Sequence, residues 1–185
     1  MRFEAWLAYH SNFNDDKQSK LIGNVSILPF SSKHRGIAPT PPNDPEYIDI
    51  ISESIILFRA NSLFRNFEIK GGGDRMLIYL ILFISDCIAK LSRGQVNSGD
   101  AMKQLHTLAV DSFSLPGEAG FPLNSLYAPP QSKMDADTLR SYLTQARVET
   151  VNRLIPILYA QSNTSPDKYW MSFNKRKFMG KSLSL

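Results

Sequence analysis

The chain has 185 residues, of which 43% are hydrophobic and 21% charged, and its formal net charge is +4. These values are ordinary for a globular protein and predict one domain, residues 1–185, with a sizeable core. The single cysteine, Cys87, excludes an internal disulfide and a thiolate zinc cluster. The longest apolar run, residues 76–84, is too short for a membrane span, and residues 1–20 lack the apolar stretch of a secretory signal. We therefore expect a cytoplasmic protein.

The N-terminal segment, residues 1–37, is too short to form a domain. Residues 21–30 within it predict an extended arm that lies over the core. The next segment, residues 38–45, contains four prolines and predicts an exposed, extended connector.

A first helix is expected from about Pro45 to Leu63. Asn43 or Asp44 is the expected N-cap, because Pro45 then occupies the first turn. The expected buried face carries apolar residues at helical spacing, which are Ile48, Ile51, Ile55 and Phe58.

Three glycines, residues 71–73, should interrupt the chain as a flexible connector. Asp74 is the expected N-cap of a second helix that ends near Leu91. Residues 76–84 are apolar on every side of that helix, so other elements must surround it. The predicted fold class is all-α, with about five helices, one central apolar helix enclosed by the others, and the extended N-terminal arm.

Three further helices are expected in the C-terminal half. One covers residues 98–111, and another begins at Ser132 with a capping box and ends or kinks at Pro156. The inward stripe of that second helix is Leu139, Leu143, Ala146, Thr150 and Leu154. The last helix should begin after Pro166 and direct Trp170 and Phe173 into the core.

The loop of residues 116–124 contains two prolines and two glycines, which exclude regular helix and strand. Phe121 and Leu123 are apolar and should dock the loop against the protein. Glu118 is its only charged residue, and the loop has no nucleophile, base or phosphate-binding side chain. A loop with a defined conformation and no reactive side chain indicates recognition through shape complementarity.

No catalytic or cofactor-binding constellation is visible in the sequence. The glycines at 71–73 lack the lysine and hydroxyl residue of a phosphate loop, and Asp74 places negative charge where an anion would bind. The three histidines share no metal-ligand spacing. We therefore expect no enzymatic activity, no cofactor and no metal.

The net charge is concentrated at the C-terminal end, residues 167–185. This segment has one acidic residue and five basic residues, which are Lys168, Lys175, Arg176, Lys177 and Lys181. The rest of the chain is neutral, so the pattern predicts a partner with an acidic surface. A solvated helix face and a nucleic-acid-binding module remain open as alternatives. Lys and Arg neutralise phosphates, and neighbouring aromatics such as Trp170 and Phe178 stack on bases.

Blocks of residues along nearly the whole chain resemble the family of subunit 3 of the actin-related protein 2/3 complex. Near the N-terminus the blocks are Ala8-Tyr9-His10-Ser11, Ile22-Gly23-Asn24 and Leu28-Pro29. The central blocks are Arg59-Ala60-Asn61, Phe67-Glu68-Ile69-Lys70 and Asp74-Arg75. The later blocks are Pro116-Gly117-Glu118, Gly120-Phe121-Pro122-Leu123-Asn124 and Lys181-Ser182-Leu183-Ser184, with Trp170, Phe173, Arg176 and Phe178-Met179 before the last.

The resemblance implies a non-catalytic structural subunit of the actin cytoskeleton that supports nucleation of branched filaments. It implies actin-related protein 3 as the main partner and actin-related protein 2 in the active state, together with other subunits and the actin filament. Met1 to Trp6 precede the family-like start and should be dispensable. The expected partner-binding residues are Glu118, Phe121, Lys168, Lys175, Arg176, Lys177, Phe178 and Lys181.

Overall fold

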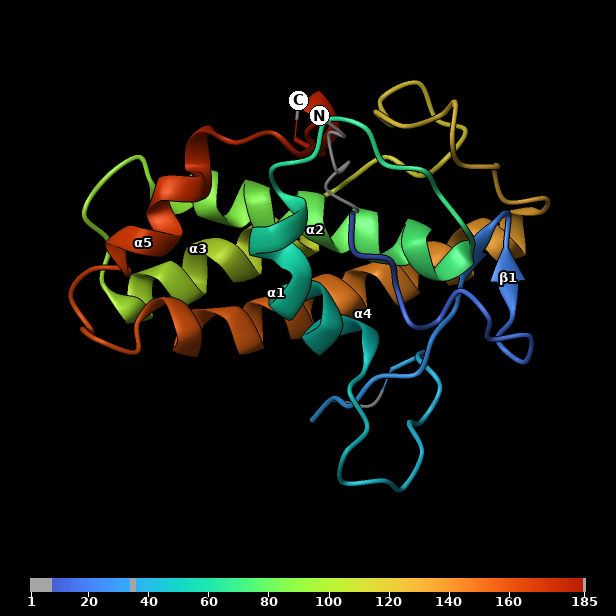
Figure 1. Ribbon diagram of the computed structural model, residues 1–185, viewed down its shortest axis with the longest axis horizontal. Coiled ribbons are helices and arrows are strands. Elements are labelled where there is room, and N and C mark those ends of the chain that lie inside the picture. The colour runs from blue at the N-terminus through green and yellow to red at the C-terminus, as the bar shows by residue number, and fades with distance from the viewer. Residues whose placement is uncertain (1–7, 34–35, 185) are drawn as a thin grey trace, which may run out of the picture.

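Five α-helices and one small hairpin form the regular structure of the described residues, 8–33 and 36–184, of the computed structural model (Figure 1). The helices are α1 (Ile50–Asn61), α2 (Gly72–Leu91), α3 (Ser98–Val110), α4 (Lys133–Leu158) and α5 (Lys168–Met171). Two 3-10 turns follow, η1 (Ser172–Lys175) and η2 (Phe178–Gly180). The expected all-α class with five helices is confirmed. Met1 to Trp6, expected to be dispensable, lie outside the described residues.

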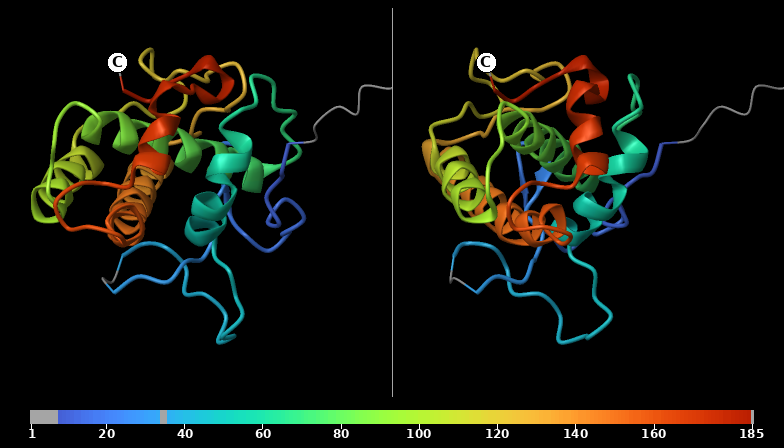
Figure 2. Two further views of the ribbon diagram at one scale, coloured as in Figure 1. Left: turned by 60° about the vertical axis from the view of Figure 1, so that its left-hand side comes forward. Right: turned by 90° about the vertical axis from the view of Figure 1, so that its left-hand side faces the viewer.

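Helix α2 lies at the centre of the molecule, and the other elements surround it (Figure 2, right). Every residue from Met76 to Ile84 is at most 3% exposed. The helix contacts α1, α3, α4, α5, η1 and the second strand of the hairpin. A helix without a polar face must be covered on all sides, and the predicted central helix is confirmed.

The N-terminal segment lies over the core as a hairpin followed by extended chain. Strands β1 (Leu21–Ile22) and β2 (Val25–Ser26) pair antiparallel, with Ile22 opposite Val25. Leu28 then docks on α4 through two hydrogen bonds with the Tyr142 hydroxyl. The Leu28 N–H donates to it, and the Leu28 carbonyl accepts from it, both at 2.9 Å. The predicted arm over the core is therefore observed, with a short hairpin inside it.

Two buried carboxylates hold the start of this segment. Asp74 accepts hydrogen bonds from His10 Nδ1 at 2.7 Å and from the Ser11 N–H at 2.8 Å. Glu53 accepts from the Ser11 hydroxyl at 2.7 Å and from the Asn12 N–H at 2.8 Å. Burial raises the pKa of Glu53 and outweighs these hydrogen bonds. The segment is thus fixed to both α1 and α2.

The expected role of Asp74 as an N-cap is wrong, because α2 begins two residues earlier and Gly71 takes the capping position. The expected flexible glycine connector is also wrong. Gly73 is buried, and a methyl group added to it would lie 2.7 Å from the backbone carbonyl carbon of Phe13. The glycine is required because the backbone of the N-terminal segment crosses the helix at that point.

Helix α1 is shorter than predicted at its N-terminus. Asp49, not Asn43 or Asp44, is the N-cap and accepts from the Ser52 N–H at 3.0 Å. Asp44 instead lies in a turn before the helix, where its backbone carbonyl accepts from the Tyr47 N–H. Ile48 therefore precedes the helix and is 54% exposed, whereas the other three residues of the predicted stripe are buried.

Helix α4 begins at the predicted capping box, where Ser132 accepts from the Asp135 N–H at 3.0 Å. Its predicted inward stripe is buried. Pro156 does not end the helix, which continues to Leu158. Pro156 lies in the last turn and removes only the hydrogen bond to the Asn152 carbonyl, while the Tyr159 N–H still donates to the Ile155 carbonyl at 3.0 Å.

An ion pair joins the start of α1 to the C-terminal part of α4. Arg153 contacts Asp49 at 2.7 Å and Glu149 at 2.8 Å, and it also donates to the carbonyl of Ser31. Burial raises the pKa of Asp49, but the hydrogen bonds and charge of Arg153 outweigh burial and lower it. One arginine thus connects the N-terminal segment, α1 and α4.

Replacing Ile81, which is fully buried in α2, by alanine should lower the free energy of unfolding by about 2–5 kcal/mol because it leaves a cavity. Ile56→Ala is the matched control, since Ile56 is 60% exposed, and should change it by less than about 0.5 kcal/mol. Urea denaturation of the full chain measures both values. Equal effects would contradict the enclosed helix.

The Asp49→Asn variant should lower the free energy of unfolding by about 1.5–3 kcal/mol at neutral pH, because Arg153 loses one of its two charged partners. The folded-state pKa of Asp49 lies below the unfolded-state value. Its contribution is therefore complete above about pH 4 and is lost as pH falls through the folded-state pKa. Denaturation curves at several pH values should show the difference from wild type shrinking in acid. The exposed Asp15→Asn control should show no such trend.

Candidate partner-binding surface

Aromatic side chains fasten the C-terminal segment to the core. Trp170 stacks on Phe58 of α1 with 5.9 Å between ring centroids, and Phe173 contacts the same ring at 5.9 Å. Phe178 is fully buried and packs edge-on against Phe67 at 5.8 Å. The predicted inward direction of Trp170 and Phe173 is confirmed. The basic end of the chain is therefore part of the folded body (Figure 2).

Hydrogen bonds fix the same segment beyond its aromatic residues. The Met179 N–H donates to the Phe64 carbonyl at 3.0 Å. Asp86 of α2 accepts from the Ser182 hydroxyl at 2.8 Å and from the Ser184 N–H at 2.9 Å. The backbone of residues 167–184 thus follows the outside of α1 and α2 and is held at both ends.

The five cations of this segment face solvent, whereas Trp170, Phe173 and Phe178 are buried. Lys168, Lys175, Arg176, Lys177 and Lys181 are all exposed. Within residues 8–33 and 36–184, the ion pairs involve none of these five side chains. Arg176 lies over the ring of Phe173 at 4.8 Å, which fixes the direction of its guanidinium. Positive charge is therefore presented on an ordered backbone and is not neutralised by these neighbours.

Three of these cations line a surface groove of about 540 Å³ between the end of α1 and the C-terminal segment. Leu63 is an apolar residue of this groove and is 61% exposed. The residues that line the groove are Ser62, Leu63, Arg65, Lys175, Arg176, Lys177, Met179 and Gly180. We call this feature the basic groove. The groove combines three cations that form no ion pair among the described residues with the exposed apolar surface of Leu63.

The outer face of α1 extends the basic groove. Ile56 is 60% exposed, and Arg59 lies 5.4 Å from the ring centroids of both Tyr169 and Trp170. Sequence reasoning missed Ile56, Arg59, Leu63 and Arg65. A usable signal was present, because Ile56 and Leu63 are apolar but fall off the predicted buried stripe of the helix.

The loop of residues 116–124 is held by its own hydrogen bonds and does not line the basic groove. Glu118 accepts from the Leu115 N–H at 2.7 Å and pairs with Arg140 at 2.9 Å. Phe121 is 4% exposed and packs edge-on against Tyr127 at 5.1 Å. The expected docking of Phe121 and Leu123 on the protein is confirmed.

Two of the eight expected partner-binding residues, Phe121 and Phe178, have buried side chains. They support the surface residues and are not themselves accessible to a partner. Glu118 is accessible, although its carboxylate already accepts from the Leu115 N–H and pairs with Arg140. Lys168 and Lys181 are exposed on the same segment but do not line the groove. The structure therefore gathers Lys175, Arg176 and Lys177 at one place and leaves the other five around or outside it.

The described residues contain no cluster of histidine, cysteine and carboxylate side chains that could hold a metal ion. Burial raises the pKa of the Cys87 thiol, which disfavours the reactive thiolate.

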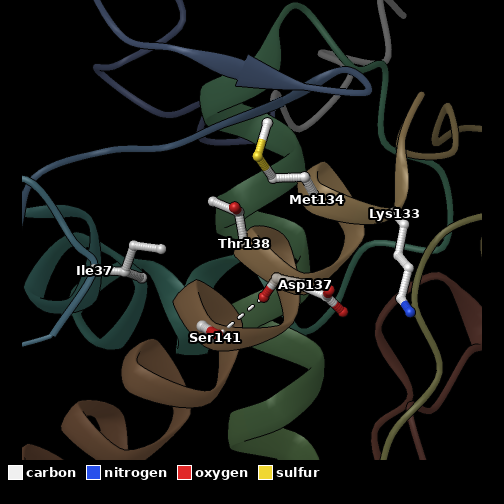
Figure 3. A pocket seen from close by; sticks show the side chains of 6 residues that line it. All are labelled: Ile37, Lys133, Met134, Asp137, Thr138 and Ser141. Carbon is white, nitrogen blue, oxygen red and sulfur yellow. Dashed lines mark hydrogen bonds between the residues drawn. The ribbon is translucent and has the colours of Figure 1, made fainter.

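Figure 3 shows a depression of about 520 Å³ that is lined by Ile37 and the first turns of α4. Within it the Ser141 hydroxyl donates to the Asp137 carbonyl at 2.9 Å, and Lys133 points away from Met134. No helix among the described residues is long and apolar enough to span a bilayer.

Comparison with known proteins agrees with the sequence blocks. The family model P21-Arc, described as ARP2/3 complex ARPC3 (21 kDa) subunit, matches residues 6–183. The chain belongs to this family. It is 51% identical to actin-related protein 2/3 complex subunit 3 of Schizosaccharomyces pombe, over 95% of this chain and 99% of the relative. The subunit 3 proteins of Dictyostelium discoideum and Saccharomyces cerevisiae are 47% and 45% identical, over 96% and 95% of this chain and 100% and 99% of the relatives.

Replacing Phe178 by alanine should destabilise the protein by about 3–5 kcal/mol, because a fully buried ring is removed. Amide exchange in residues 176–184 should accelerate more than exchange in α2, since Phe178 fastens this segment. Tyr169→Ala is the control within the same segment, as Tyr169 is 57% exposed. Unchanged exchange in residues 176–184 of Phe178→Ala, measured by mass spectrometry, would contradict the anchoring.

Proposed function

We propose that this chain is a non-catalytic structural subunit of an actin-related protein 2/3 complex and that the basic groove is one of its contact surfaces. The groove carries the proposal. It joins three cations without ion pairs among the described residues to exposed Leu63 and to the outer face of α1. In such a surface charge steers association, and apolar side chains buried on docking hold the complex together.

The partner of this surface is acidic, and we assign it to the actin-related proteins. Family membership supports other subunits of the complex as partners. Among them we place actin-related protein 3 as the main contact, with actin-related protein 2 joining in the active state and the actin filament nearby. This assignment puts the chain in the cytoplasmic actin cytoskeleton, where the complex would start branched filaments. Lys168 and Lys181 are exposed on the same C-terminal segment and would extend the contact.

The basic segment suits a protein partner better than a nucleic acid. The family relatives named above are subunits of a protein complex. Trp170, Phe173 and Phe178, which would stack on bases, are turned into the core and buried. Tyr169 is the one exposed ring among residues 167–184, so phosphate contacts would dominate and would give only weak, salt-sensitive binding of nucleic acid. The nucleic-acid-binding alternative is therefore not supported.

Reversing two charges of the groove in Lys175→Glu/Lys177→Glu should slow docking of the chain into a complex reconstituted from the remaining subunits. We expect the association rate to fall on the order of tenfold at low salt and less at high salt, because screening weakens steering. Lys103→Glu/Lys133→Glu carries the same change in net charge on α3 and α4 and serves as the control. Stopped-flow fluorescence measures the rate.

Two results would contradict the proposed function. The first is equal slowing by the control pair, which would show that net charge and not the groove matters. The second is ATP hydrolysis or actin nucleation by the purified chain alone, because a structural subunit contributes only within the assembled complex. Circular dichroism of both variants should match the wild type, since all four lysines are exposed.

A further inference from the structure

The proline-rich connector forms a loop that projects from the body on the side away from the C-terminal segment (Figures 1 and 2). Its start is fixed to the body, because the Ala38 N–H donates to Gln145 Oε1 of α4 at 2.9 Å. Near its other end the Tyr47 N–H donates to the Asp44 carbonyl at 3.1 Å in a local turn just before α1. Between these points, residues 39–43 take part in no hydrogen bond within the described part of the chain.

Thr40 lies in the middle of this loop. It is exposed, and the hydrogen bonds of the described residues leave its hydroxyl unengaged. Pro39 precedes it, and Pro41 and Pro42 follow it. A residue before proline is driven to extended backbone, and proline itself has a fixed φ and no N–H to satisfy. The Thr40 hydroxyl therefore lies on an extended segment without hydrogen bonds, between the Ala38 anchor and the turn at Asp44.

These features are those that a protein kinase requires of a substrate. The catalytic cleft of such an enzyme binds several residues in extended conformation and must reach the hydroxyl oxygen. Residues 39–43 offer this without the loss of any hydrogen bond. Thr40-Pro41 also provides proline directly after the acceptor, the feature by which proline-directed kinases select their sites.

We propose that Thr40 is a phosphorylation site for a proline-directed serine/threonine kinase. The Thr40 oxygen would form a bond to the γ-phosphorus of ATP, and the bond between that phosphorus and the leaving ADP oxygen would break. The hydroxyl proton passes to the catalytic aspartate of the kinase. The products are phosphothreonine, ADP and one proton, and ATP is the only co-reactant.

The sequence around Thr40 restricts the kinase further. The third residue after it is Asn43, so kinases that need a basic residue at that position are disfavoured. A second hydroxyl-proline pair, Ser165-Pro166, offers an internal comparison. Both of its residues are half-buried, and the adjacent Asp167 N–H donates to the Leu158 carbonyl at 2.7 Å. The structure thus ranks Thr40 well above Ser165 as an acceptor.

Modification of Thr40 would change the charge of a neighbouring groove. Thr40 lines a depression of about 790 Å³ whose lining includes one acidic residue, Asp16, and one basic residue, Lys20. A phosphate adds a charge of about −1.5 to −2 at neutral pH. The rim of this groove would change from neutral to acidic without any rearrangement of the core.

The test treats the full folded chain with an active mitogen-activated protein kinase and Mg-ATP, and mass spectrometry locates the phosphate. We expect modification of Thr40 at a rate within about tenfold of that for a synthetic peptide of residues 36–47, because the loop needs little opening. Thr40→Val should abolish this signal, and Ser165→Ala should leave it unchanged. The same reaction on the reconstituted complex should also label Thr40.

Three outcomes would overturn the proposal. The peptide could be modified while the folded chain is not, which would show that the loop is inaccessible. Neither could be modified, which would exclude this kinase class. The chain alone could be modified while the complex is not, which would show that another subunit covers the loop.

Discussion

The absence of a polar face on residues 76–84 of α2 is the constraint on which the structure depends. A helix whose residues from Met76 to Ile84 are all apolar stays folded in water only when it is covered on every side. Four helices, the hairpin and the C-terminal turns provide that cover. Segments that look irregular in sequence are therefore structural. The N-terminal segment is fixed by Asp74 and Glu53, and residues 167–184 by Phe178 and Asp86.

This arrangement links the core to the proposed contact surface. Trp170 and Phe173 pack on Phe58 of α1, and Phe178 packs on Phe67. The lysines and the arginine of the C-terminal segment therefore face outward from a fixed backbone. A flexible basic tail would lose conformational freedom on docking, and that cost would weaken binding. A prefolded one keeps its charges beside Leu63 before the partner arrives. The residues that build the core thus also determine the geometry of the basic groove.

The sequence predicted the elements that follow from periodicity and composition. The enclosed α2, the capping box at Ser132 and the inward Trp170 rest on local patterns, and the structure contains them. Contacts between distant residues were not predictable. Arg153 and Asp49 are 104 positions apart in the sequence. The sequence therefore could not show that Asp49, and not Asp44, is the N-cap of α1. The groove joins the end of α1 to a segment more than a hundred residues later, and only the basic half of it carried a sequence signal.

The most direct test of the account is a cryo-electron microscopy structure of the reconstituted complex that contains this chain. In that structure, an acidic surface of an actin-related protein should bury Leu63 together with Lys175, Arg176 and Lys177. Residues 76–84 should remain enclosed as in the free chain. A structure in which the basic groove faces solvent, and another face of the chain forms every subunit contact, would contradict it.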